Sequence, residues 1–258
     1  MAHDLPARGA TIRLAGASVW YSKDIQALRD IDLELTSGTT ALVGVNGAGK
    51  STLMSVVAGG LRPTDGSVTM DEVNLYGRRR RGALRRVALM PQFLTMPKSL
   101  TTLEAVSVLA WMRGLPGKTV RARSIAALEA VDLASHTHRK VKELSGGMLR
   151  RVALAQAIVA DPDVLLLDEP STGLDPQQRR GMVELVKRLS GTVIFSSHLM
   201  EDVMDVADRV VVLHEGIVRF DGSLDSLKNI APNGTAPGRQ TEAAFLELIA
   251  DRKGTAHR

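Results

Sequence analysis

Apolar residues occupy alternate positions near the start of the chain, over residues 11–20 and 28–35. This spacing predicts two strands that each bury one face and expose the other, as in an antiparallel sheet. Farther along, short apolar runs alternate with segments of helical spacing at residues 177–190 and 199–209. Buried strands joined by helices are typical of a mostly parallel sheet with helices on its faces. The runs expected to form its strands are residues 39–44, 163–170, 192–198 and 209–216.

The middle of the chain has a different pattern. Residues 99–114 begin with Thr101 and Glu104, which have the spacing of a capping box, and helical spacing continues beyond them. We therefore expect a helical insert over residues 93–161. After the last predicted strand, residues 231–240 are rich in proline, glycine and small polar residues, which predicts a linker before a short amphipathic helix.

Composition narrows the class of protein. The 258 residues are 44% hydrophobic, so the chain can bury a sizeable core and is neither disordered nor fibrous. Its apolar runs are far shorter than the ~18 residues that a membrane-spanning helix needs. No cysteine is present, and the N-terminal segment lacks the apolar stretch of a secretory signal, so we expect a cytoplasmic location. The net charge of +5 is compatible with nucleic acid, an acidic membrane surface or a solvated arginine-rich exterior, of which the last is commonest.

A glycine-rich segment follows the first of the buried runs. Residues 44–51 fit the pattern G-x-x-x-x-G-K-[ST], in which small residues let backbone N–H groups converge on phosphate oxygens at a helix start. Lys50 is expected to reach the β- and γ-phosphates, and Ser51 to place its hydroxyl on a magnesium ion. A chance glycine-rich turn is the alternative, but the order strand, loop, helix favours the phosphate site. The residues expected to bind nucleotide here are Gly44, Asn46, Gly47, Ala48, Gly49, Lys50, Ser51 and Thr52, with the helix beginning at Thr52.

Two carboxylates end the buried run at residues 163–170. An acidic residue at a strand end beside a phosphate loop suits a magnesium ligand, and Asp168 is expected to take that role. Side chains alternate along a strand, so Glu169 points differently and is expected to act as general base toward the attacking water. An ordinary acidic strand end is the alternative, which the phosphate loop makes weaker.

Six motifs stand in a fixed order along the chain: GVNGAGKST, MPQ, LSGGM, VLLLDEP, STGLD and SSH. With them the chain closely resembles the ATP-binding subunits of ABC transporters, over residues 12–227. The resemblance implies an α/β fold that is P-loop NTPase-like, with a mostly parallel sheet, an N-terminal antiparallel β subdomain and an inserted helical subdomain. The implied ATP-binding domain covers residues 11–230. Its parts are a core at residues 11–92 and 162–230, a helical subdomain at residues 93–161, and a following linker and short helix at residues 231–258.

The resemblance also implies roles for single residues. Tyr21 matches the aromatic that stacks on adenine, with Trp20 a less favoured substitute and a core position the alternative. Gln92 matches the glutamine that touches magnesium and water. His198 matches the histidine that contacts the γ-phosphate. Asp175 matches a carboxylate that communicates across a dimer, and it also fits a helix N-cap before a proline.

The segment LSGGM, here called the signature, implies dimerisation. By itself a Ser-Gly-Gly helix start is a weak signal. In the resembled family, two domains meet head to tail, so Ser145, Gly146 and Gly147 would face the ATP held by the other domain. The signature usually ends in glutamine, and Met148 in its place removes a polar contact near the ribose without touching these residues.

Partners follow from the same resemblance. ATP and Mg²⁺ are the expected ligands, and the expected partners are integral membrane permease subunits and a second ATP-binding subunit, in a homodimer or a heterodimer. The chain would then be peripheral on the inner face of the cell membrane. Residues 90–116 and the signature region are similar to subunits of export-type systems, which favours export over import. The sequence does not specify the transported substrate.

The sequence supports other functions less well. A non-transport ABC ATPase acting on nucleic acid or the ribosome is the alternative that the basic charge favours, but sustained heptads and a second copy of the domain are both missing from the sequence. We expect no nucleic-acid partner. A small-molecule kinase would not explain the signature or Gln92.

Two further groups of residues are expected to have no functional role. The pair His136 and His138 has no third ligand and is expected at the surface. The run at residues 78–81 is better explained as a solvated charged loop than as a lipid-binding segment.

Overall fold

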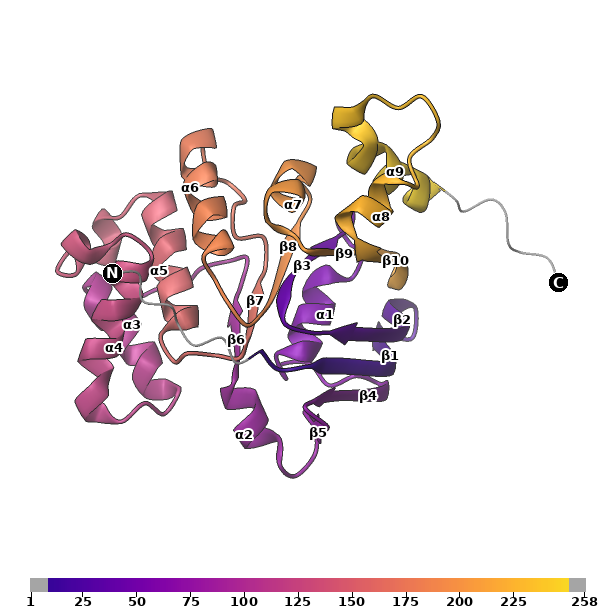
Figure 1. The fold of residues 1–258 in the computed structure, drawn as a ribbon. Helices are drawn as coiled ribbons and strands as arrows, with labels where there is room; N and C mark the ends of the chain where they lie inside the picture. The colour runs from indigo at the N-terminus through magenta and orange to yellow at the C-terminus, as the bar shows by residue number, and fades with distance from the viewer. Residues whose placement is uncertain (1–8, 251–258) are drawn as a thin grey trace.

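The computed structural model describes residues 9–250, and two sheets organise this part of the chain (Figure 1). One sheet has four strands in the order β2-β1-β4-β5, and the other has six in the order β10-β9-β3-β8-β7-β6. The predictions about residues 1–8 and 251–258 lie outside the described residues. These are the absence of a secretory signal and the very end of the linker and helix.

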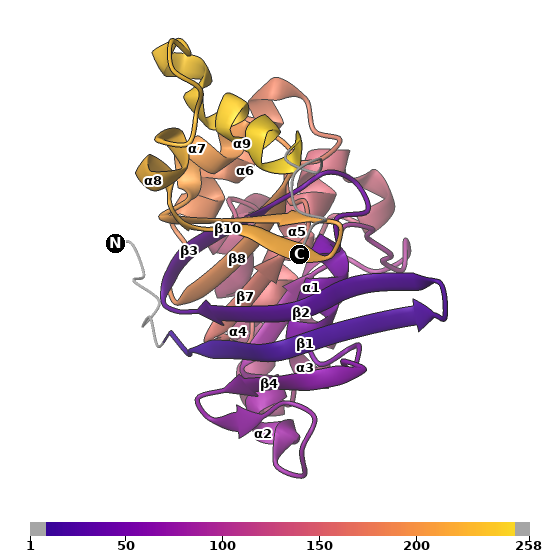
Figure 2. The ribbon, with the colours of Figure 1, turned by 90° about the vertical axis from the view of Figure 1, so that its right-hand side faces the viewer.

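The first sheet is antiparallel. In β1 (Ile12–Ser22) and β2 (Ile25–Leu35) buried and exposed residues alternate, because one face lies on the core and the other faces solvent. The predicted N-terminal antiparallel pair is therefore confirmed, and both strands extend beyond the predicted bounds. The sheet also contains two strands that the sequence pattern did not predict, β4 (Asp65–Met70) and β5 (Val73–Asn74). Figure 2 shows β2, β1 and β4 side by side across one side of the molecule.

The second sheet is mostly parallel, as predicted. Its central strands β7 and β8 are buried along their whole length, because helices or the other sheet cover both faces. The edge strand β10 (Ile217–Ser223) pairs antiparallel with β9 and was not predicted. The parallel strands are β3 (Gly38–Val43), β6 (Val87–Met90), β7 (Val164–Leu167), β8 (Thr192–Ser197) and β9 (Arg209–His214).

Helices cover the second sheet from both sides. Helix α1 (Lys50–Val57) lies between the two sheets and shares one apolar core with them. On the other face, α5 (Gly146–Ile158) and α6 (Pro176–Lys187) pack into a second core. The remaining helices are α2 (Arg80–Arg85), α3 (Thr102–Met112), α4 (Gly117–Ala130), α7 (Met200–Val206), α8 (Leu224–Lys228) and α9 (Gln240–Ala250), with short 3₁₀ turns at Ala134–His136, Val141–Glu143 and Pro237–Arg239.

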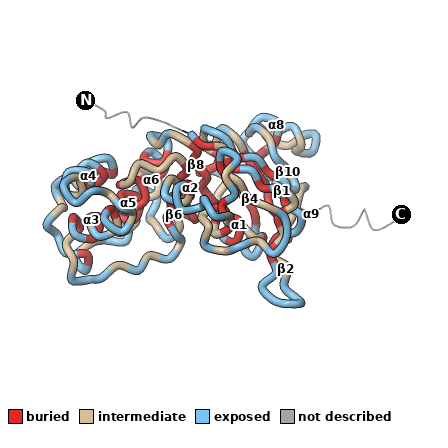
Figure 3. The backbone as a smooth tube through the Cα atoms, turned by 90° about the horizontal axis from the view of Figure 1, so that it is seen from below, coloured by how far each residue is buried: buried red, intermediate tan, exposed pale blue. Residues whose placement is uncertain are grey.

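Three helices, α3, α4 and α5, lie together at one end of the molecule (Figure 1). They fall within the segment predicted to form the helical insert, and the predicted capping box of Thr101 and Glu104 begins α3. Burial follows the strands and the inner helices, whereas the peripheral loops are exposed (Figure 3). The α/β fold class is thus confirmed, while the limits assigned to the domain and its parts stay predictions. No helix within residues 9–250 is both long enough and apolar enough to cross a bilayer.

Two local predictions were wrong. Helix α1 begins at Lys50, two residues before the predicted start at Thr52, because the left-handed Gly49 precedes the helix directly. The arginine run, expected as a loop, enters helix α2 at Arg80, although residues 78–81 are all exposed as predicted.

Candidate functional site

The glycine-rich loop connects β3 to α1. Gly49 has a φ of 105°, and a Cβ there would lie 2.6 Å from the carbonyl oxygen of Ala27. A Cβ on Gly44 would lie 2.4 Å from the carbonyl oxygen of Leu213. Only glycine fits both positions, so the loop lies against its neighbours and leads directly into the N-terminus of a helix. A loop of this kind suits the binding of an anion by backbone N–H groups, which stays a prediction.

Lys50 lies under this loop. Its side chain is buried, and Nζ donates to the backbone oxygens of Gly44 at 2.8 Å and Val45 at 3.2 Å. Burial lowers the pKa of Lys50, while the negative charges of Glu169 and Asp168 raise it. The loop therefore holds a poorly solvated cation near two carboxylates, and its N–H donors bond neutral carbonyl oxygens, which a charged phosphate group could replace.

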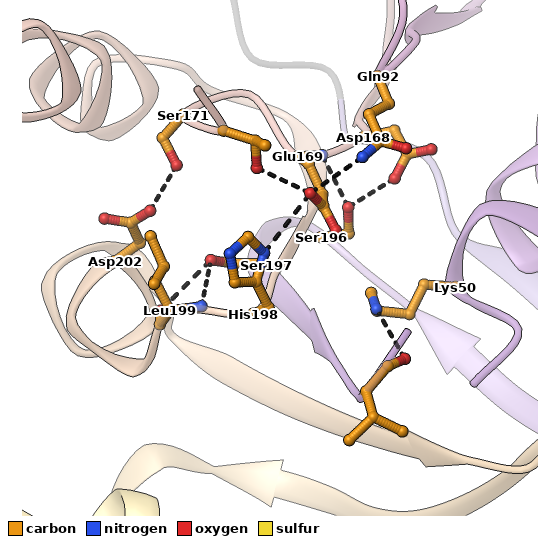
Figure 4. Close-up of polar contacts among 12 residues, drawn as sticks. Lys50, Gln92, Asp168, Glu169, Ser171, Ser196, Ser197, His198, Leu199 and Asp202 are labelled. Atoms are coloured by element: carbon orange, nitrogen blue, oxygen red, sulfur yellow. Dashed lines mark hydrogen bonds and ion pairs between the residues drawn. The ribbon is translucent and has the colours of Figure 1, made fainter. Parts of the chain in front are cut away.

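Asp168 and Glu169 follow β7, and the neighbouring strand β8 holds them in place (Figure 4). Ser196 of β8 is fully buried, and its Oγ donates to Oδ1 of Asp168 at 2.7 Å and accepts from the backbone N–H of Glu169 at 2.8 Å. Both acidic residues are only 7% exposed. One hydroxyl thus fixes two adjacent acidic residues.

The carboxylate of Glu169 is a meeting point for polar side chains. Its Oε2 accepts from Oγ1 of Thr172 at 2.7 Å and from Nε2 of Gln92 at 3.2 Å, and it lies 3.5 Å from Nδ1 of His198. Figure 4 shows Gln92 and His198 directed at Glu169 from different parts of the chain. The structure therefore brings together Glu169, selected from its place at a strand end, with Gln92 and His198, which the resemblance selected.

The residues predicted to hold magnesium supply oxygen ligands only. Asp168 offers a carboxylate, Ser51 a hydroxyl and Gln92 an amide oxygen, which are the donors that Mg²⁺ prefers. Residues 9–250 contain no group of three or more histidine, cysteine, aspartate and glutamate side chains that would suit a metal. A site with one carboxylate fits Mg²⁺, which keeps several waters and is completed by phosphate oxygens. The donor set is thus compatible with this cation.

Tyr21 lies beside the phosphate loop. It is 60% exposed at the end of β1, and its hydroxyl lies 3.1 Å from Oγ1 of Thr52 in the first turn of α1. Trp20 is 43% exposed. The alternative of a core aromatic is therefore wrong for Tyr21, and its ring face is available to a planar ligand.

The signature begins α5. Ser145 is its N-cap and accepts from the backbone N–H of Met148 at 3.3 Å. Gly147 is buried, and a Cβ there would lie 2.5 Å from Oε1 of Gln178 in α6. Asp175 caps α6 by accepting from two backbone N–H groups, as its second interpretation predicts. Helix α5 lies with α3 and α4, apart from α1 (Figure 1).

Sequence reasoning missed two residues of the site, Thr172 and Ser196. Each stands in a motif already singled out, STGLD and SSH, but no pattern indicated that their hydroxyls bond the two carboxylates. His138 is exposed, in agreement with its surface assignment, whereas His136 is half-buried beside Ser135.

The chain is similar in sequence to known proteins. The family model described as ABC transporter matches residues 28–172. The Nod factor export ATP-binding protein I of Burkholderia orbicola (strain AU 1054) is 39% identical over 189 residues, which are 72% of this chain and 62% of that protein. The daunorubicin resistance ATP-binding protein DrrA3 of Streptomyces coeruleorubidus is 35% identical over 84% of this chain and 69% of that protein.

A solved structure has the same fold. The dimeric structure of MJ0796, a bacterial ABC transporter cassette, is similar with a TM-score of 0.73 and 25% identity, over 83% of this chain and 98% of that one. The match to the Nod factor protein spans 62% of that relative's length, so part of the relative has no counterpart in the aligned residues.

Proposed function

The chain belongs to the ABC transporter family, and from this premise we propose that it binds and hydrolyses ATP to drive transport through separate membrane subunits. The observation that carries the proposal is the carboxylate of Glu169. It lies at the end of β7 with Thr172, Gln92 and His198 around it. A buried lysine under a glycine-rich loop accompanies it in the same chain.

ATP would bind with its phosphates on the loop and its adenine on Tyr21. The loop offers backbone N–H groups at the start of α1, and Lys50 would exchange its present carbonyl partners for phosphate oxygens. The exposed ring of Tyr21, fixed at its hydroxyl near Thr52, would stack on the base. The residues proposed to bind the phosphates are Gly44, Asn46, Gly47, Ala48, Gly49, Lys50, Ser51 and Thr52.

Magnesium would be held by Ser51, Gln92 and Asp168. When bound, this cation neutralises charge on the phosphate oxygens. Asp168 is oriented for that role, because Ser196 already occupies its Oδ1 and leaves its other oxygen for a ligand.

Glu169 would accept the proton of the attacking water. Its carboxylate is nearly buried, and donors at a single oxygen, Oε2, leave the other oxygen for water. His198, 3.5 Å from the same carboxylate, would contact the γ-phosphate and hold the geometry of the group.

Dimerisation would complete the site. Ser145, Gly146 and Gly147 are at the start of α5, and this helix lies apart from α1 of the same chain, which fits their contacting a nucleotide bound elsewhere. The similar cassette MJ0796 is dimeric. We propose a head-to-tail dimer of either two copies of this chain or this chain and a related subunit.

The proposed partners are permease subunits that place the chain at the cytoplasmic face of a membrane. Two of the reported relatives bear names of export and drug resistance, which supports export as the direction. The transported substrate would be selected by the permease rather than by this chain.

Glu169→Gln tests the proposal. The variant keeps the shape of the side chain and loses its charge, so ATP and Mg²⁺ should bind while hydrolysis falls by roughly 10²- to 10⁴-fold, the usual value of a general base. Slow hydrolysis should let the ATP-bound dimer accumulate. Light scattering with saturating ATP should show twice the monomer mass, and ADP should reverse this. Glu184→Gln removes an exposed carboxylate paired with Lys187 and is the matched control, expected to match the wild type.

Two results would contradict the proposal. One is a Glu169→Gln variant that hydrolyses ATP at the wild-type rate. The other is a Lys50→Ala variant with near-normal turnover, because the phosphates would then not depend on the buried cation.

A further inference from the structure

Arg150 connects the signature helix to the loop that carries Glu169. It lies one turn into α5, after the N-cap Ser145. Its Nη2 donates to the backbone oxygen of Thr172 at 3.2 Å, across the gap between α5 and the segment that follows β7. A guanidinium that crosses between two elements fixes their spacing, because its fork is planar and its donors are rigid.

The guanidinium of Arg150 is held at a cost. Its Nη1 is buried and has no hydrogen-bond partner within residues 9–250. Burial lowers the pKa of Arg150, while the charges of Glu169 and Asp168 raise it. A buried cationic donor without a partner is expensive, and such groups call for an explanation beyond stability. The proximity of two carboxylates offers one.

Thr172 passes this contact on to Glu169. The backbone oxygen of Thr172 accepts from Arg150, while its hydroxyl donates to Oε2 of Glu169 at 2.7 Å. The backbone N–H of Thr172 also donates to the backbone oxygen of Glu169 at 3.3 Å. Thr172 is therefore bonded to Glu169 at two points and to α5 at a third, so a displacement of α5 reaches the carboxylate through one residue.

We propose that Arg150 is a positioning residue that couples the signature helix to the orientation of Glu169, through Thr172. The inference rests on the proposed function, in which Ser145 contacts the ATP of the second subunit. Under that function, the N-cap of α5 contacts the ATP bound by the second subunit. One turn later, Arg150 connects α5 to Glu169, the general base that acts on the ATP bound by its own chain. Seating of Ser145 on one ATP then sets the geometry for hydrolysis of the other.

The test separates positioning from folding. Arg150→Gln keeps part of the side chain but cannot span to Thr172 with a guanidinium fork. We expect kcat to fall about tenfold, because a misplaced base loses part of its effect, while KM for ATP stays within about twofold. In the Glu169→Gln background, Arg150→Gln should leave the ATP-driven dimer intact. A merely structural role in α5 would disturb dimerisation as well.

Variants of Thr172 test the other end of the same connection. Thr172→Val replaces the hydroxyl with a methyl group and should lower kcat about as much as Arg150→Gln does, whereas Thr172→Ser, which keeps a hydroxyl, should retain the wild-type kcat. The double variant should be no slower than the slower single variant, because both changes break one connection. Arg123→Gln, which removes an exposed arginine from the neighbouring α4, is the matched control and should behave as the wild type. If Arg150→Gln does not fold, Arg150→Lys takes its place in every comparison, because lysine keeps the positive charge but lacks the planar guanidinium fork.

The outcomes are distinguishable. A wild type that does not hydrolyse ATP refutes the proposed function and this inference with it. The second outcome is that the wild type hydrolyses ATP and loses this activity in Lys50→Ala, while Arg150→Gln and Thr172→Val keep the wild-type kcat. That result refutes this inference alone. Loss of the ATP-driven dimer in Arg150→Gln, or losses of kcat that multiply in the double variant, would also overturn it.

Discussion

Ser196→Ala is a severe test of how the two carboxylates are held. The substitution removes one oxygen atom from a fully buried residue of β8 and changes nothing at the surface. That oxygen donates to the carboxylate of Asp168 at 2.7 Å and accepts from the backbone N–H of Glu169 at 2.8 Å. Alanine can do neither.

The expected cost follows from these two bonds. A hydrogen bond to a charged group contributes about 1.5–3 kcal/mol, and a buried donor left without a partner costs about 1–3 kcal/mol. The free energy of unfolding should therefore fall by about 3–4 kcal/mol, a large part of the ~5–15 kcal/mol that holds a typical domain together. Hydrolysis should fall too, because Asp168 and Glu169 lose their common support.

Urea unfolding of the nucleotide-free protein measures the first quantity. The matched control is Ser197→Ala on the same strand, since Ser197 is also buried but, among the described residues, its side chain bonds only the nearby backbone of Leu199. We expect the control to lose ~1 kcal/mol or less. In an Asp168→Asn background, Ser196→Ala should cost less, because the bond no longer reaches a charge. A loss below 1 kcal/mol, or a loss equal to that of Ser197→Ala, would refute the reasoning.

Three further predictions concern other parts of the molecule. Gly49→Ala should lower the free energy of unfolding by about 2 kcal/mol or more in urea titrations and abolish ATP binding, because its Cβ would meet the oxygen of Ala27 at a φ of 105°; equal stability would contradict the close packing of the loop. Ser145→Arg should keep nucleotide binding to the monomer, measured by calorimetry, but lose ATP hydrolysis. An equal loss of binding and hydrolysis would contradict this, because Ser145 would then contact the nucleotide of its own chain. Hydrogen bonds from the backbone N–H and hydroxyl of Thr101 lower the pKa of Glu104 below its ordinary 4.5, so its stabilising effect is present above pH 4.5 and is lost as the pH falls below that value. Urea unfolding should therefore separate the wild type from Glu104→Gln at neutral pH but not in strong acid, and a constant difference would refute this assignment.

Local sequence patterns determined much of the site. Residues close together in the chain define the phosphate loop, because its glycines, Lys50 and the following helix form one continuous segment. The caps at Thr101 and Asp175 are equally local, since each side chain bonds backbone groups within three residues. The placement of Asp168 and Glu169 at a strand end follows from one apolar run.

Strand order and register decided the rest. Sequence periodicity says that a strand exists but not which strand lies beside it. Because β8 lies between β3 and β7, and Phe195 pairs with Leu167, Ser196 comes level with Asp168. The roles of Thr172 and Arg150 depend in the same way on how α5 packs against the segment after β7. Contacts between residues far apart in the chain leave no local pattern, so only the tertiary structure revealed them.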